Sequence, residues 1–146
     1  MGGFLMKKTI IFKALITALL LAAIACILFG KNVLYGPGFT ISNNYIDALI
    51  RKADTSFRMT TTVYVWILMI CSIASIVLVW LKSCKMSMIA GIICLIPSIS
   101  NMVIDIANKY SPFSFDCPCD FFMFILPVAA AVLCFILSNI SKKEAA

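Results

Sequence analysis

The stretch from Thr61 to Ile106, TTVYVWILMICSIASIVLVWLKSCKMSMIAGIICLIPSISNMVIDI, decides the fold of this chain. It holds two apolar runs, Thr61 to Leu81 and Met86 to Ile106, with only Lys82-Ser83-Cys84-Lys85 between them. A helix that crosses the hydrocarbon core of a bilayer needs about 20 mostly apolar residues, and each run has that length. The short basic link therefore predicts a tight antiparallel pair of membrane-spanning helices.

Two more apolar runs of similar length flank this pair, from Ile10 to Phe29 and from Phe121 to Ile140. Lys13 is the one charged residue in the first run, and it lies close enough to the end for its side chain to reach the membrane surface. Four such runs predict an all-α integral membrane protein, a four-helix bundle that forms a single transmembrane domain over residues 1–146.

The first run also has a second interpretation. Lys7 and Lys8, the apolar stretch and the small residues Ala23 and Ala25 together imitate a cleaved signal peptide. The apolar stretch continues to Phe29, however, and further spans follow it. These two features favour a first span that stays in the protein.

Composition supports a location in a membrane and excludes several classes of enzyme and metal site. Of the 146 residues, 63% are apolar and only 12% are charged. A soluble domain of this size cannot bury so much apolar surface, so lipid is expected to cover the excess. The sequence contains no histidine, which excludes Ser-His-Asp and Cys-His nucleophile systems and histidine metal sites. These absences favour a non-enzymatic role, and no cofactor is predicted.

The distribution of charge predicts an orientation. The formal net charge is +6, but the basic residues lie at the ends of apolar runs, so nucleic acid is not a predicted partner. An even number of spans places both termini on one side of the membrane. That side carries one acidic residue, Glu144, and seven basic residues: Lys7, Lys8, Lys13, Lys82, Lys85, Lys142 and Lys143. On the other side, basic and acidic residues balance. The positive-inside bias then predicts cytoplasmic termini in a cell membrane, with the bacterial cytoplasmic membrane favoured.

The first outer loop, Gly30 to Thr60, carries two local signals. Gly36-Pro37-Gly38 predicts a turn. After a capping residue at Asn44, apolar residues recur at helical spacing and form one face of an amphipathic helix, namely Ile46, Leu49, Ile50 and Phe57. We expect this helix to lie in the outer membrane interface, either as a lid that completes the fold or as a docking surface for a partner.

The most unusual local pattern is Asp116-Cys117-Pro118-Cys119-Asp120, where the second outer loop enters the last span. Cys117 and Cys119 can act as a dithiol or hold a soft metal such as Cu(I), and Asp116 and Asp120 can add ligands. A disulfide between the two would close a strained ring, which suits exchange chemistry. The alternative is a rigid turn that happens to contain cysteines. The cysteines inside the spans are interpreted as small packing residues, namely Cys26, Cys71, Cys94 and Cys134.

With four spans, a long first outer loop and thiols at the start of the last span, the chain is similar in topology to vitamin K epoxide reductases. That family carries Cys-x-x-Cys where this chain has Cys117-Pro118-Cys119. It also carries a second cysteine pair in the first outer loop, where Gly30 to Thr60 has no cysteine. Electron relay between two pairs is therefore excluded, and the resemblance concerns architecture only.

The third run carries Ser98, Asn101 and Asp105 just after Pro97. Because proline removes a backbone donor and frees a carbonyl, these polar groups can line the wet cavity of a solute carrier. Small multidrug transporters resemble the chain in size, but the acidic residue of their first span is missing from Ile10 to Phe29. The alternative is that the polar groups hold helices together, with Asp105 at the headgroups.

Three functional hypotheses follow. The leading one is a small non-enzymatic protein that acts through another membrane protein, as an accessory subunit or as an immunity or exclusion factor. Its partners are the lipid bilayer and the spans of that second protein. The second hypothesis is thiol redox or soft-metal handling by Cys117 and Cys119. The third is a small-solute carrier that uses Asn101 or Asp105.

Overall fold

The fold is known from a computed structural model of the chain. It describes residues 2–36, 38–45, 56–81, 83–107 and 118–145. Within these residues lie four helices and two strands: α1 (Gly2–Phe29), β1 (Lys31–Gly36), β2 (Phe39–Asn44), α3 (Ser56–Trp80), α4 (Cys84–Ala107) and α5 (Pro118–Ala145). Each helix is long and apolar enough to cross a membrane. The predicted four-helix membrane bundle is therefore confirmed, and each predicted span corresponds to one helix. The helices are longer than predicted, since α1 begins eight residues and α3 five residues before the predicted starts.

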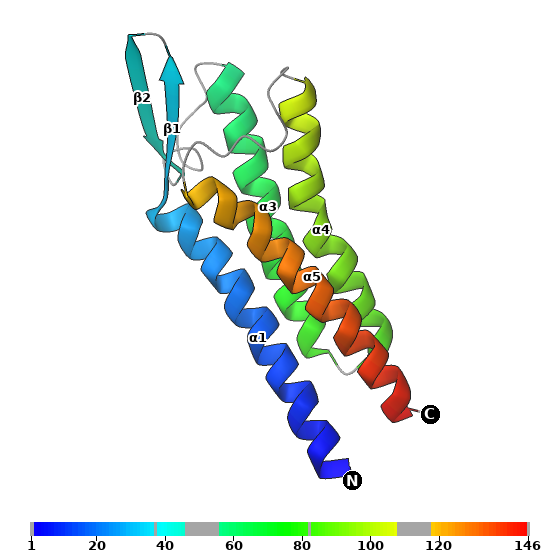
Figure 1. Ribbon diagram of the computed structural model, residues 1–146. Helices are drawn as coiled ribbons and strands as arrows, with labels where there is room; N and C mark the ends of the chain where they lie inside the picture. Colours follow the sequence, from blue (N-terminus) through cyan, green and yellow to red (C-terminus); the bar gives the residue numbers. More distant parts are fainter. Residues whose placement is uncertain (1, 37, 46–55, 82, 108–117, 146) are drawn as a thin grey trace.

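The four helices pack as a ring. Helix α1 contacts α3 and α5, and α4 contacts the same two helices from the other side. Figure 1 shows that consecutive helices run in opposite directions, which brings the N- and C-termini to the same end of the bundle. Between α3 and α4 the chain turns within three residues, and the Ser83 carbonyl accepts the Ser87 backbone N–H at 3.3 Å to begin α4. The short link therefore forms the tight pair that the sequence predicts.

At the other end, the loop between α1 and α3 contains a β-hairpin that the sequence analysis did not predict. Strands β1 and β2 pair in antiparallel register from Lys31↔Asn44 to Gly36↔Phe39, and they extend beyond the ends of the helices (Figure 1). The predicted turn at 36–38 lies at the tip, where Gly38 has φ +85°, a left-handed conformation that glycine adopts without steric cost. Strands this short carry a weak periodic signal, which explains why the sequence pattern missed them.

Most of the predicted amphipathic helix, including Ile46, Leu49 and Ile50, lies outside the described residues. Phe57 lies in the first turn of α3, because that helix begins at Ser56 rather than at Thr61. The prediction of a separate interfacial helix therefore stays a prediction for residues 46–55.

The buried core has two parts along the bundle axis. Near the termini, small and aliphatic residues of all four helices form one cluster, here called the terminal cluster: Ile16, Leu20, Val79, Ala90, Cys94, Ala130, Ala131, Cys134 and Leu137. Near the β-hairpin, larger side chains form a second cluster, here called the hairpin cluster: Ile27, Tyr45, Tyr64, Val65, Leu68 and Met123. The two clusters set the environments of every polar group that the helices enclose.

Candidate functional site

The polar groups of the hairpin half gather where proline interrupts α5. Pro127 has no backbone N–H, so the carbonyl of Met123, four residues earlier, loses its helical donor. The Tyr64 hydroxyl of α3 donates to this carbonyl at 3.3 Å. Because an unpaired carbonyl in hydrocarbon is costly, the contact explains how a helix with an internal proline remains stable inside the bundle.

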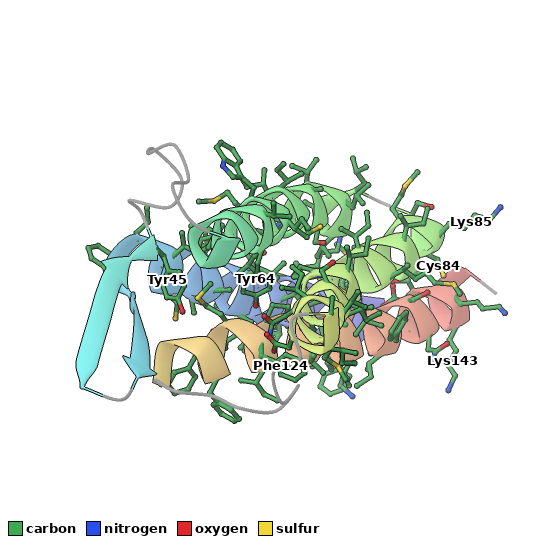
Figure 2. The ribbon with its side chains drawn as sticks, turned by 90° about the horizontal axis from the view of Figure 1, so that it is seen from above. Tyr45, Tyr64, Cys84, Lys85, Phe124 and Lys143 are labelled. Atoms are coloured by element: carbon green, nitrogen blue, oxygen red, sulfur yellow. The ribbon has the colours of Figure 1, made fainter. Side chains whose placement is uncertain are left out.

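A second hydroxyl supports the same stretch of α5 from the other side. Ser98 of α4 donates from Oγ to the carbonyl of Phe124 at 2.9 Å, and Ser98 follows directly after Pro97. Pro97 and Pro127 are both fully buried. The two interrupted helices are therefore joined at the level of their prolines, with Tyr64 and Phe124 lying on the side of the bundle nearest the β-hairpin (Figure 2).

The predicted polar residues of α4 differ in their roles. The Ser98 hydroxyl is used in the helix-to-helix bond, as the helix-packing alternative requires. Asn101 and Asp105 are half-buried on the following turns of α4. Helical spacing alone could not reveal the bond of Tyr64 to Met123, because Tyr64 lies on another helix.

Sequence reasoning also missed Tyr45, which follows the second strand of the hairpin. Its side chain is 2% exposed and packs within the hairpin cluster. The backbone N–H of Tyr45 donates to the Gly30 carbonyl at 3.3 Å, so both ends of the β-hairpin are fixed to the bundle. Its buried hydroxyl has no hydrogen-bond partner among the described residues. The only sequence signal was an aromatic residue directly after the polar stretch Ser42-Asn43-Asn44.

The predicted thiol site cannot be described in the same detail. Asp116 and Cys117 lie outside the described residues, and Cys119 and Asp120 lie in the first turn of α5 with side chains that are not described. Elsewhere in the described part of the chain, five cysteines take part in no disulfide: Cys26, Cys71, Cys84, Cys94 and Cys134. No group of three or more His, Cys, Asp or Glu side chains is placed to hold a metal among the residues described.

The terminal end of the bundle is held by polar contacts between helices. Cys84 and Ser138 bond reciprocally, since the thiol donates to the Ser138 carbonyl at 3.0 Å and the Ser138 hydroxyl donates to the Cys84 carbonyl at 3.2 Å. Trp80 donates from Nε1 to Thr17 Oγ1 at 3.0 Å, and the Lys13 ammonium lies 5.9 Å from the Trp80 ring. A tryptophan beside a lysine at a helix end is typical of the membrane–water interface.

Comparison with known protein families, curated proteins and solved structures finds no match to this chain. The function therefore has to be argued from the described residues themselves.

Proposed function

We propose that the protein is a non-enzymatic membrane subunit that acts by packing one face of α4 against a transmembrane helix of another membrane protein. The proposal is supported first by the use of the polar groups. Ser98, Tyr64 and Ser75 each donate to a backbone carbonyl of a neighbouring helix. Hydroxyls that hold helices together in this way are structural, and they favour a scaffold over a catalyst.

The observation that carries the proposal is the outward face of α4. Exposed β-branched residues follow one another along it at alternating spacings of three and four, and this α4 ridge consists of Ile89, Ile92, Ile96, Ile99, Val103 and Ile106. The spacing matches the seam of helices that pack side by side, in which stiff β-branched side chains fit between those of the partner. No charged residue interrupts the α4 ridge, so its partner surface is apolar.

The outward face of α3 offers a contrast. It has the same spacing, but tryptophans occupy both ends of the apolar stretch, at Trp66 and Trp80. Paired interfacial tryptophans are typical of a helix that faces lipid and positions itself between the two headgroup layers. The α4 ridge contains no aromatic residue. We therefore assign α3 to the lipid side and α4 to the partner, which is a transmembrane helix rather than a soluble protein.

The test compares two substitutions on equally exposed isoleucines. Ile99 on α4 and Ile70 on α3 are 57% and 59% exposed, and each lies well inside the apolar stretch of its helix. Ile99→Trp adds bulk in the proposed seam, whereas Ile70→Trp adds the same bulk toward lipid. In native membranes treated with a cross-linker, we expect the wild-type chain and Ile70→Trp to yield the same adduct with an integral membrane protein. We expect Ile99→Trp to lose most of it.

If both variants keep the adduct, or if both lose it, α4 is not the docking face. Monomeric protein with no cross-linked partner in native membranes would remove the proposed function as a whole.

The proposed subunit has both termini in the cytoplasm of a cell, and the favoured location is the bacterial cytoplasmic membrane. Lys7, Lys8, Lys85, Lys142 and Lys143 lie at the end of the bundle where the termini meet, and Figure 2 shows Lys85 and Lys143 there. The positive-inside bias supports a cytoplasmic position for this end. A reporter fused after Ala146 is expected to be active only inside the cell, and activity outside would reverse the orientation.

A further inference from the structure

The terminal cluster contains two thiols. They are separate from the predicted pair Cys117 and Cys119. Cys94 of α4 and Cys134 of α5 are 1% and 0% exposed, and they lie where α4 and α5 approach each other most closely, one turn from Gly91. Both belong to the same buried cluster. They are thus two potential thiolate ligands that face each other across one helix pair and are shielded from water.

The local backbone explains why the sulfur atoms come together. Gly91 lies one turn before Cys94, and a Cβ added at Gly91 would lie 3.2 Å from the Cys134 Cβ and 2.9 Å from Phe135 Cε1. The residue at this point must therefore lack a side chain. Ala90 on α4 and Ala130 and Ala131 on α5 keep the rest of the seam narrow, as small residues do between membrane helices.

We propose that Cys94 and Cys134 form a two-coordinate site for one soft monovalent cation, Cu(I) or its analogue Ag(I). Thiolate sulfur selects Cu(I) over harder cations. A structural zinc site needs four ligands, and no cluster of three or more candidate ligands exists among the described residues. Two sulfur atoms on facing helices suit an ion with linear two-coordinate geometry.

The binding step balances without an oxidant or reductant. Two thiols and one Cu(I) ion give a bis-thiolate complex and two protons, and the two new Cu–S bonds replace two S–H bonds. The metal keeps its oxidation state, and the complex carries one negative charge. Because thiols must lose their protons to bind, occupancy is expected to fall at low pH.

Serine hydroxyls of α3 can stabilise that buried negative charge. Ser75 is 0% exposed and donates to the Ala90 carbonyl at 3.3 Å, one turn before Cys94 on α4. Ser72 lies one turn away on the same buried stripe of α3. Its hydroxyl is fully buried with no hydrogen-bond partner among the described residues. A buried donor without a partner is costly.

The test uses the full-length chain in lipid nanodiscs, kept anaerobic. Cys117→Ser and Cys119→Ser are present in every sample so that the other thiol pair contributes nothing. Cu(I) is titrated against a coloured Cu(I) chelator, and sulfur coordination is checked by X-ray absorption. We expect one tightly held Cu(I) per chain with two sulfur neighbours. Cys94→Ser and Cys134→Ser are each expected to weaken binding at least 100-fold.

Cys71→Ser is the matched control, because Cys71 lies on α3 near Cys94 but does not contact Cys134 in the proposed site. It should bind like the parent chain. Cys134→Ala, which removes the ligand and any new hydrogen bond, guards against a serine-specific folding defect, and every variant must elute as one peak. The site is refuted if all variants bind equally, or if the parent chain binds no Cu(I) under these anaerobic conditions.

Discussion

The two halves of the bundle reach the same helical packing by opposite means. In the terminal half, the helices stay regular and approach closely, because Gly91, Ala90 and the residues opposite them on α5 are small. In the hairpin half, Pro97 and Pro127 interrupt two helices, and larger residues fill the space. Two helices can therefore approach closely only where their side chains are absent or small. A helix that contains a proline instead needs hydrogen-bond donors from neighbouring helices.

The largest expected effect belongs to the close approach in the terminal half. Gly91→Leu places a side chain where even a single carbon would lie 2.9 Å from Phe135. We expect it to lower the free energy of unfolding by about 3 kcal/mol, the upper range for overpacking, measured by thermal denaturation in detergent. Gly3→Leu, where nothing lies within 4 Å, is the control and should leave the transition unchanged. Equal stability of both variants would mean that α4 and α5 are not in close contact.

The next effect tests whether a tyrosine compensates for the break in α5. Tyr64→Phe removes the donor to the Met123 carbonyl and is expected to cost about 1 kcal/mol, as for other hydrogen bonds between membrane helices. In a Pro127→Ala background, the alanine N–H restores the helical bond, so the same change should cost almost nothing. The four chains form a double-mutant cycle measured by thermal denaturation. If Tyr64→Phe lowers the stability equally in both backgrounds, the Tyr64 hydroxyl does not compensate for the proline.

A smaller effect of opposite sign is expected at Tyr45. Its hydroxyl is buried with no partner among the described residues, so Tyr45→Phe removes a polar group that is not hydrogen-bonded. Thermal denaturation should show a gain of about 0.5 kcal/mol, since burying an unpaired hydroxyl is unfavourable. A loss of stability would show that the hydroxyl has a partner in the membrane-embedded protein.

The smallest effect is expected at the exposed ends of α1 and α5. Thr9 donates from Oγ1 to Glu144 Oε1 at 3.0 Å at the surface of the terminal half. Water competes for both groups there, so Thr9→Val should leave the unfolding temperature unchanged within error. A clear drop would mean that the termini are held together by more than the described contact.

The sequence predicted the helices far better than it predicted the contacts between them. Each apolar run is long, and its length alone indicates a span, so the four helices were found, although α1 begins eight residues before its predicted start. The β-hairpin was missed because six-residue strands give little periodic signal, although the turn at 36–38 was recognised. Within the candidate site, Ser98 was found through its place beside Pro97. Tyr45 and Tyr64 were not found, because their importance depends on other helices.

By itself, the sequence determined that this chain is a helical membrane protein with four spans, since about 20 consecutive apolar residues can satisfy their backbone only as a helix in lipid. The short link predicted that α3 and α4 adjoin, but only the tertiary structure decided the other helix neighbours. It brought Cys94 to Cys134, Ser98 to Phe124 and Tyr64 to Met123, because such pairs join residues 26 to 59 positions apart and depend on how the helices rotate and approach. The length and composition of one segment determine whether that segment forms a span. A contact between two segments depends on how all the helices pack together.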